Sequence, residues 1–573
     1  MGVGAMFVLA ALSQAKLQIL ERENTIELAN ATKRFTLRKI DKARRGSIFS
    51  SDGKPLAQDA NAYELTVQFA RVPKSDAFFL DLANATGIAA SEFSSIAESG
   101  AKSKTWDDAV SSDRAEAISE VKTKWRADGV SLKAAADREY PLGEAASCVV
   151  GVVREQSQVV KGTGVNGIPP RFERGVAATG LESSRNDLLT GQDGVRVGLT
   201  DRDGAFLPMR MEDEGKARID GKAITLTIDS DLQDFATQAI KKAVEEHDAE
   251  NGVAIVITPG EGDILAMANW PSFDPNGHIQ GEFGYNPAYM AQLEPGSTFK
   301  ILTLAKAMDE GKVDLNSIVQ CRGVLSVTAK GKPVHCDSHH GNRAHGTTDS
   351  IKAIAKSCNV SAATWALRVG RPQMIDYIQK LGLLKRTGIG GTKEARGLFR
   401  FDEYAQTLQL AHVGFGQSIT CTPLGLASAF SMLGNGGTLV PPRLIKKVGD
   451  EELPVGPGER ILKEETVDKM VTCLESVIES DSGTGKDLRI PGYRLGGKTG
   501  TAQKVGSGVK GYVSNFIGFV PARNPRAVVL VMVNNPKKGY YGATVAGPAF
   551  KEIAKQVIRH FNIPPSVTSK AGQ

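Results

Sequence analysis

Cysteine is scarce in this chain, with six residues among 573, spread from Cys148 to Cys473. So few and so scattered cysteines do not form the framework of a small disulfide-stabilised domain. Charge of a single sign is also lacking, because 70 basic residues stand against 64 acidic ones and leave a net charge of only +6. This balance excludes the basic footprint of a nucleic-acid-binding protein. The hydrophobic content of 41% is that of an ordinary globular protein with two or three domains.

One uncharged apolar run stands out at the N-terminus, from Gly2 to Leu12. A membrane-spanning helix needs roughly 20 apolar residues. The run together with the following residues up to Leu20 reaches that length only if Lys16, near the far end, extends its amine to the interface. The run has neither the basic segment nor the A-x-A cleavage site of a removable signal peptide. We predict an uncleaved single-pass anchor over residues 1–20 in the cytoplasmic membrane, with the rest of the chain extracytoplasmic and a start upstream of Met1 allowed. The alternative is a buried helix.

The region up to residue 220 shows no cluster of catalytic side chains. Residues 21–36 have the polar helical pattern of a stalk that leaves a membrane. An alternating stretch from Tyr63 to Val67 predicts a strand, and short helices are expected over 76–86 and 113–125. We predict a supporting N-terminal domain over residues 21–220.

The sequence pattern changes at Ile224, where a short strand precedes Asp229 as the cap of a helix over 232–246. Further strands then come from both ends of a second domain, with helices inserted between them. They are expected over 253–258, 263–268, 516–520 and 527–533, before a last helix over 548–560. An antiparallel sheet of this kind, flanked by helices, is an α+β fold. We predict this domain over residues 221–563 and a flexible tail over 564–573.

One serine is placed to act as a nucleophile. Ser297 follows Pro295-Gly296 and opens an apolar-periodic segment that ends at Gly311, which is typical helix punctuation. Lys300 lies one turn later on the same face, where its amine can reach the hydroxyl. Serine needs an adjacent base, and lysine is one only when burial or a second cation lowers its pKa. The pattern alone is weak, since Ser-x-x-Lys also begins at Ser13, Ser51, Ser99, Ser119 and Ser507.

Two later motifs select Ser297 from these six. Ser357-Cys358-Asn359 lies 60 residues further on, after a predicted helix over 351–356. Lys498-Thr499-Gly500-Thr501 lies another 141 residues on and holds the only Lys-Thr-Gly of the chain. The combination is far more specific than its parts. A phosphate-loop-like segment, Gly483-Thr484-Gly485-Lys486, is rejected because Asp487 replaces the hydroxyl residue that would hold magnesium.

In this order the motifs resemble those of the penicillin-binding protein and serine β-lactamase superfamily, and the likeness covers nearly the whole chain. It points to class B penicillin-binding proteins, the monofunctional peptidoglycan D,D-transpeptidases. RRGSIFSSDGKPLA, at residues 44–57, is similar to a motif of their elongated N-terminal pedestal. The motifs that follow in family order are LTIDSDLQ, GDILAMANWPSFDPN, EPGSTFK, GFGQ and KTGTAQK. The resemblance implies a transpeptidase domain of the family's α+β fold on a dimerisation-type pedestal.

The resemblance also assigns a role to each catalytic residue. Ser297 attacks the carbonyl between two D-alanines and is acylated, and neutral Lys300 takes its proton. The positive charge of Lys498 discourages a second protonation of that amine. Ser357 relays a proton to the departing amine, and Asn359 holds the peptide amide and Lys300. A β-lactam antibiotic is trapped on the same serine.

Binding of the substrate is assigned to the last motif. Thr499, Gly500 and Thr501 receive the terminal carboxylate of the stem peptide. The backbone N–H groups of Ser297 and Thr501 form the oxyanion hole, worth about 3 kcal/mol per donor. No cofactor is required by the resemblance. The implied partners are stem peptides on a lipid-linked precursor glycan, β-lactams, the membrane, a separate glycan polymerase and division proteins, without nucleic acid.

The C-terminal stretch resembles the division branch, septal or sporulation, more than the elongation branch. The residues that carry this are 511–533 and Tyr541 to Pro548. Two departures weaken the subfamily assignment: Ser50-Ser51 replace the usual Asp-Arg of the pedestal motif, and Ala543 replaces a second glycine. We predict cross-linking during septal cell-wall synthesis. The alternatives are an elongation-type enzyme, a D,D-carboxypeptidase or β-lactamase on the same site, and, least favoured, a non-catalytic scaffold or β-lactam sensor.

Soft metal ligands flank the Ser357 motif. They are Cys321, Cys336, His345 and Cys358, with His335, Asp337, His339 and His340 close by. Such a set can bind a structural zinc ion tetrahedrally. Some elongation-type relatives carry a structural metal in this region, although with a different ligand spacing. A Cys321–Cys336 disulfide is equally allowed outside the cytoplasm, and ordinary buried or solvated side chains are the third possibility.

Overall fold

The structure is a computed structural model that describes most of the chain between Thr36 and Ser566. The described ranges are 36–41, 43–59, 62–135, 138–153, 158–159, 172–173, 179–200, 206–208, 216–277, 284–329, 331–336, 344–389, 393–400, 406–503 and 511–566. The predicted anchor over 1–20 and the stalk up to residue 35 lie outside these ranges. Within the ranges, no helix is both long and apolar enough to cross a membrane.

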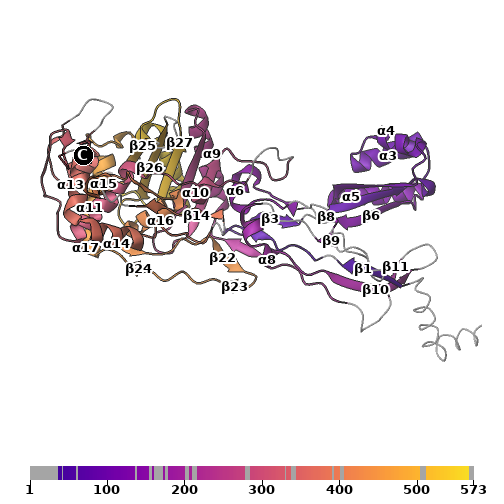
Figure 1. The fold of residues 1–573 in the computed structure, drawn as a ribbon. Coiled ribbons are helices and arrows are strands. Elements are labelled where there is room, and N and C mark those ends of the chain that lie inside the picture. The colour runs from indigo at the N-terminus through magenta and orange to yellow at the C-terminus, as the bar shows by residue number, and fades with distance from the viewer. Residues whose placement is uncertain are drawn as a thin grey trace, which may run out of the picture. The chain divides into compact units, whose positions relative to one another are not determined.

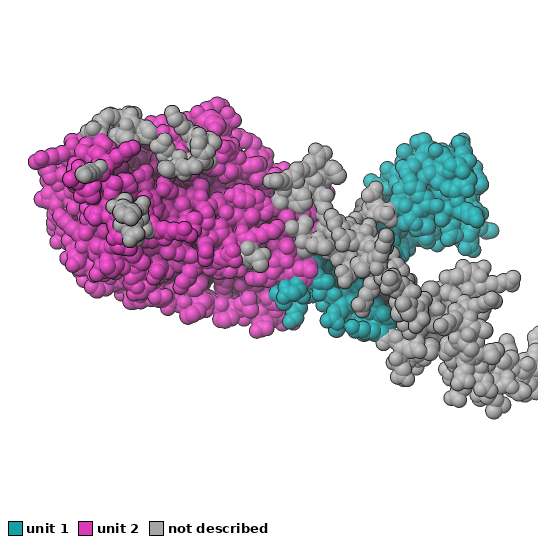
Figure 2. Space-filling model, in the orientation of Figure 1, with its two compact units in different colours: residues 1–47, 59–137, 187–223 teal, residues 48–58, 138–186, 224–573 magenta. Residues whose placement is uncertain are grey.

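The chain divides into two compact units, which Figure 2 shows in different colours. Unit 1 comprises residues 1–47, 59–137 and 187–223, and unit 2 comprises residues 48–58, 138–186 and 224–573. Each unit is therefore assembled from segments that are far apart in the sequence.

Unit 1 contains a three-stranded antiparallel sheet in the order β5-β4-β6, packed with three helices (Figure 1). The strands are β4 (Ala62–Gln68), β5 (Ser103–Ser111) and β6 (Val130–Ala135), and the helices are α3 (Asp76–Thr86), α4 (Ala90–Glu98) and α5 (Ser112–Trp125). The strand and both helices predicted for this region are thus confirmed. Its core contains aromatic rings in contact, Phe79 stacked on Phe93 and Phe93 tilted against Trp106. A second sheet pairs β10 (Gly194–Thr200) with β1 (Thr36–Asp41) and β11 (Phe206–Pro208).

Unit 2 is built on a five-stranded antiparallel sheet in the order β14-β13-β27-β26-β25 (Figure 1). The strands are β13 (Asn251–Ile257), β14 (Ile264–Trp270), β25 (Gly496–Gln503), β26 (Tyr512–Val520) and β27 (Ala527–Asn534). Because β13 pairs with β27, strands from both ends of the domain lie side by side, as predicted. Strand β25, which carries the Lys-Thr-Gly motif, is at one edge.

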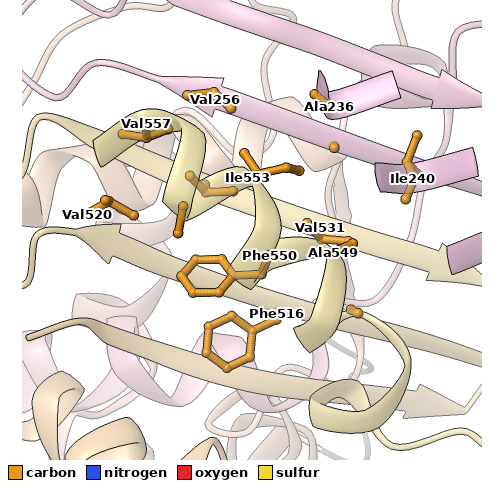
Figure 3. Close-up of a cluster of buried hydrophobic side chains, with 14 of the residues drawn as sticks. Ala236, Ile240, Val256, Phe516, Val520, Val531, Ala549, Phe550, Ile553 and Val557 are labelled. Carbon is orange, nitrogen blue, oxygen red and sulfur yellow. The ribbon is translucent and has the colours of Figure 1, made fainter. Parts of the chain in front are cut away.

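Helices cover both faces of this sheet. Phe516 and Phe519 are an odd number of residues apart on β26, so their side chains point to opposite faces. Phe516 contacts Phe550 of α19 (Gly547–His560), with ring centroids 4.5 Å apart. On the other face Phe519 contacts Phe430 of α16 (Pro423–Gly434). Helix α9 (Ser230–Glu246), capped by Asp229 as predicted, joins α19 in the buried cluster of Figure 3.

Unit 2 also contains a six-stranded sheet in the order β23-β22-β12-β2-β3-β7, in which β3 is Pro55–Asp59, β7 is Arg138–Glu139 and β23 is Glu451–Glu452. Strand β12 (Ile224–Leu226) pairs with β2 (Ile48–Phe49) on one side and β22 (Ile445–Val448) on the other. Arg138 lies in the edge strand β7; its Nε donates to Glu182 Oε1 at 2.8 Å, and both side chains are buried. Residues 48–58 and 138–186 are thereby integral to the unit that carries the motif residues.

Candidate active site

The serine predicted as the nucleophile lies in a tight turn. Ser297 belongs to a 3-10 turn, η4 (Gly296–Thr298), that leads directly into helix α11 (Phe299–Asp309), which confirms the predicted helix start. Gly296 has a left-handed φ of +58°, and a Cβ there would lie 3.3 Å from the carbonyl oxygen of Thr501. Glycine allows both the turn and this close approach. The turn therefore places Ser297 beside the Lys-Thr-Gly strand.

Lys300 sits one turn later on α11, with only 1% of its surface exposed. Its Nζ donates to the carbonyl oxygen of Ser357 at 2.6 Å and to Ser357 Oγ at 3.0 Å. Burial lowers the pKa of Lys300 from 10.5 to about 8, against the opposing potential of Cys336 and Cys358. Near neutral pH a fraction of this amine is thus unprotonated and able to act as a base.

Ser357 connects Lys300 to a second lysine. It stands between α12 (Ser350–Ala355) and α13 (Asn359–Val369) with a left-handed φ of +56°, a conformation that costs about 1–3 kcal/mol. The Nζ of Lys498 donates to Ser357 Oγ at 3.0 Å. Lys498 is fully buried, and burial, together with the charge of Lys300, holds the pKa of Lys498 well below 10.5. A hydroxyl between two such amines can pass a proton from one group to another.

Asn359 opens helix α13. Its Nδ2 donates to the carbonyl oxygen of His335 at 2.8 Å. Its backbone N–H donates to Cys336 Sγ at 3.1 Å. Among the described residues no hydrogen bond joins Asn359 to Lys300, so its predicted role in holding that lysine and the peptide stays a prediction.

The Lys-Thr-Gly-Thr motif runs along the edge strand β25. Lys498 Nζ, besides its bond to Ser357, donates to Thr499 Oγ1 at 3.2 Å. A Cβ on Gly500 would lie 2.0 Å from Asn515 Oδ1, so any other residue there would displace the buried Asn515 side chain. The strand therefore brings one amine and two threonines to the site, and the three motifs predicted from the sequence meet in unit 2.

Two residues outside the predicted motifs also border the site. Asn515, on β26, is fully buried, and its Nδ2 donates to the carbonyl oxygen of Pro295 at 3.4 Å. Thr484, in the turn that follows helix α17 (Glu464–Glu479), lies with its Oγ1 at 3.2 Å from Thr499 Oγ1. No local pattern marks either of them. Their signal is the cross-strand register and the loop path, which appear only in the folded chain.

The four predicted soft ligands come together in one cluster. They are Cys321 at the end of β15 (Val319–Cys321), Cys336 after β17 (Val334–His335), His345 before β18 (Gly346–Thr348), and Cys358 at the cap of α13. Their ligand atoms all lie within 4.8 Å of one another. Residues 337–343, which include the neighbouring Asp337, His339 and His340, are outside the described ranges.

The spacing of this cluster fits a tetrahedral metal ion. The Sγ of Cys336 lies 3.6 Å from that of Cys321 and 3.5 Å from that of Cys358, and Cys321 Sγ lies 3.7 Å from His345 Nδ1. Zinc–sulfur bonds of about 2.3 Å at tetrahedral angles require sulfurs about 3.8 Å apart. A disulfide would instead require about 2.05 Å. The backbone N–H groups of Val360 and Ser361 also donate to the sulfurs of Cys336 and Cys358, as suits thiolates.

Comparison with known proteins agrees with this geometry. The family described as penicillin binding protein transpeptidase domain matches residues 252–555, more than half of the chain. The chain belongs to the penicillin-binding protein family. The family described as penicillin-binding protein dimerisation domain matches residues 40–226. The resemblance to class B penicillin-binding proteins is thus confirmed, and this family requires no cofactor.

Two named proteins show which members of the family this penicillin-binding protein is similar to. The probable peptidoglycan D,D-transpeptidase PenA of Neisseria meningitidis is 34% identical over 436 residues, which cover 75% of this chain and 69% of the relative. Stage V sporulation protein D of Bacillus subtilis is 31% identical over 452 residues, covering 76% and 66%.

Solved structures show the same fold. A peptidoglycan synthetase from Bifidobacterium adolescentis matches this penicillin-binding protein with a TM-score of 0.68 at 25% identity, over 93% of this chain and 98% of the other. Penicillin binding protein 3 from Mycobacterium tuberculosis, complexed with aztreonam, matches with a TM-score of 0.66 at 26% identity, over 92% and 98%. The likeness therefore extends over nearly the whole length of both chains.

Proposed function

We propose that this protein is a peptidoglycan D,D-transpeptidase that cross-links stem peptides through an acyl-enzyme on Ser297. The observation that carries the proposal is the meeting of two buried lysines, Lys300 and Lys498, on the Ser357 hydroxyl next to the Ser297 turn. The name of the Neisseria relative, probable peptidoglycan D,D-transpeptidase PenA, supports the same reaction.

In the acylation step, Ser297 Oγ bonds to the carbonyl carbon of the penultimate D-alanine. Its proton passes to neutral Lys300, the C–N bond to the terminal D-alanine breaks, and Ser357 relays a proton from the two amines to the departing nitrogen. The amine of a neighbouring stem peptide then attacks the ester. It forms the new amide bond and returns the proton to Ser297 Oγ.

The other residues of the site bind the two negatively charged groups of this reaction, the oxyanion and the terminal carboxylate of the substrate. The backbone N–H groups of Ser297 and Thr501, whose turn and strand lie side by side, stabilise the oxyanion. Thr499, Gly500 and Thr501 receive the terminal carboxylate, with Lys498 behind them. Asn359 holds the peptide amide.

We further assign the protein to the division branch of the family. The C-terminal stretch that ends at Pro548 supports this assignment, and so does the sporulation protein among the relatives. Residues 1–20 would anchor the protein in the cytoplasmic membrane, residues 21–220 form the pedestal, and residues 221–563 work outside the cytoplasm. A transpeptidase of this kind acts beside a separate glycan polymerase and division proteins.

Adduct counting with a penicillin tests this function against the hydrolase alternative. We expect one stable penicilloyl adduct per chain by intact-protein mass spectrometry, and peptide mapping should place it on the segment that contains Ser297. Transfer of a D-alanyl-D-alanine donor to an added amine would yield the amide product. Continuous penicillin hydrolysis over many turnovers, without a stable adduct, would instead identify a β-lactamase.

We also propose that Cys321, Cys336, His345 and Cys358 bind one structural zinc ion. The ion would fix Cys358, and with it Ser357 and Asn359 on either side, by bonds from three other segments. The residues fit this role because their atoms have tetrahedral spacing and backbone N–H groups point at two of the sulfurs. The ion would stabilise the fold and take no part in the acylation chemistry.

Metal analysis tests this site directly. We expect about one zinc per wild-type chain by elemental mass spectrometry, and less than about a tenth of that in Cys336→Ser, together with a melting temperature lower by several degrees. Cys473→Ser is the matched control, because Cys473 is buried outside the cluster and should leave zinc unchanged. If the unfolded wild type showed two fewer reactive thiols than its six cysteines, and no metal, the disulfide would be correct instead.

A further inference from the structure

One buried side chain links the strand of the Lys-Thr-Gly motif to the turn of the nucleophile. Asn515 on β26 stands opposite Gly500 on β25, and it is fully buried. Side chains that pair across two strands lie on the same face, so Asn515 fills the space that a side chain at Gly500 would take. A Cβ on Gly500 would lie 2.0 Å from Asn515 Oδ1 and 2.8 Å from its Nδ2. The carboxamide of Asn515 therefore lies against the backbone of β25.

The same carboxamide holds the turn. Its Nδ2 donates to the carbonyl oxygen of Pro295, two residues before Ser297, at 3.4 Å. The hydroxyl of Thr298 donates to that oxygen as well, at 2.7 Å, so both lone pairs of the oxygen have a donor. Among the described residues, the bond from Asn515 is the one hydrogen bond between residues 295–298 and the five-stranded sheet. The turn is thus joined to the sheet at this point.

The other half of the carboxamide has no partner. Asn515 Oδ1 is buried and accepts no hydrogen bond from any described residue. A buried carbonyl oxygen without a donor is destabilising, whereas an apolar side chain of the same shape would avoid this penalty. The asparagine is therefore unfavourable for stability, and the one hydrogen bond that its amide makes is the bond to Pro295. Such a residue suits a functional role better than a packing role.

The two segments that Asn515 joins carry the proposed oxyanion hole. Its donors are the backbone N–H groups of Ser297, in the turn, and of Thr501, on the strand. They act together only if the turn and the strand keep a fixed separation, because both donors must reach the same oxygen. The turn is also held by Gly416, whose carbonyl oxygen accepts the N–H of Gly296 at 3.0 Å. Asn515 supplies the matching restraint from the sheet.

We propose that Asn515 is a positioning residue for the oxyanion hole. Its carboxamide fixes the distance between the N–H groups of Ser297 and Thr501, and it touches no substrate atom because it is fully buried. The inference rests on the proposed function. Loss of the amide should weaken stabilisation of the tetrahedral intermediate and leave both the initial binding of the ligand and the fold intact.

Replacement of Asn515 with leucine tests this inference, because leucine keeps approximately the same size and removes both polar atoms. Stopped-flow measurements with a fluorescent penicillin on the full chain give the dissociation constant of the non-covalent complex and the first-order rate constant of acylation. In Asn515→Leu we expect acylation to slow by about 30-fold and the dissociation constant to change by less than about threefold. The melting temperature should stay at or above that of the wild type, because the unpartnered oxygen is gone.

A boronic acid probes the oxyanion hole directly. Its boron bonds to Ser297 Oγ, Lys300 takes the proton of that hydroxyl, and the tetrahedral anion that results directs one oxygen to the two N–H groups. The affinity for the boronic acid should fall together with the acylation rate in Asn515→Leu, by about 30-fold. Asn515→Ala, which removes the amide without adding bulk, should show the same difference between penicillin binding and acylation.

The matched control is Asn534→Leu in the neighbouring strand β27. Asn534 Oδ1 is likewise buried without a partner among the described residues, and its Nδ2 donates to Glu250 at 3.2 Å. This variant should change neither constant. Unchanged acylation in both variants at Asn515 would overturn the inference. Equal weakening of penicillin binding and acylation, with a lower melting temperature, would also overturn it, because the residue would then be purely structural. A wild-type chain that forms no penicilloyl adduct would overturn the proposed function and this inference with it.

Discussion

Replacing Ser297 with alanine is expected to abolish covalent penicillin labelling, by at least about 10⁴-fold in rate. The hydroxyl is the atom that forms the ester, and no neighbouring group of the site can replace it. The fold should tolerate the change. The turn is held by backbone, since the N–H of Gly296 donates to the carbonyl oxygen of Gly416 at 3.0 Å, and Ser297 Oγ has no hydrogen bond among the described residues.

Gel fluorescence with a labelled penicillin, read beside the melting temperature, measures this effect. Ser119→Ala is the control, because Ser119 and Lys122 show the same Ser-x-x-Lys spacing within helix α5 of unit 1. Ser119 is exposed there, so we expect full labelling of that variant. Labelling that persists in Ser297→Ala at wild-type strength would place the nucleophile elsewhere.

The choice of Ser297 shows how much the sequence could predict. Proline and glycine before it, and apolar periodicity after it, are local signals, so the helix start was predictable. Four strands of the five-stranded sheet were predictable for the same reason, because continuous apolar runs rich in β-branched residues, such as Ala527–Asn534, are local patterns, whereas the edge strand β25 was not predicted. Grouping Ser297 with Ser357 and Lys498 needed the order of motifs as well.

The interactions inside the site could not be predicted, since each depends on segments far apart in the chain. Ser357 has a left-handed φ at the point where Lys300 binds its carbonyl oxygen and Cys358 caps the next helix. Neither contact has a sequence signature. The convergence of the soft ligands is of the same kind: their density along the chain suggested a site, but only the fold shows that the four segments meet.

The position of Thr484 beside Thr499 could not be predicted from local sequence patterns. Its glycine-rich segment resembles a phosphate loop and was rejected as one on its sequence, so no local pattern placed it beside the motif strand. The glycines serve a different need, namely the close approach of Gly483 to the backbone of α17. The structural reason for the spacing of these glycines is visible only in the folded chain, where the positions of the helix and the strand are known.

Acylation by this protein should depend on pH in a way set by Lys300. Its folded pKa of about 8 lies below 10.5 because burial penalises the ammonium form. The neutral amine is the base, so the rate should rise with pH, level off above about 8, and fall roughly tenfold for each unit below. Penicillin acylation measured from pH 6 to pH 9.5 reports this profile.

Substitution of Lys300 separates its basicity from its charge. Lys300→Ala removes the base, and Lys300→Arg keeps a cation that cannot be deprotonated, so both should lower the acylation rate by about 10³-fold and lose the inflection near pH 8. Lys306→Met, on the same helix but paired with Glu310, is the control and should keep the wild-type profile. An active Lys300→Arg would show that the site needs a positive charge at this position, and the base would then have to be the second buried amine, Lys498.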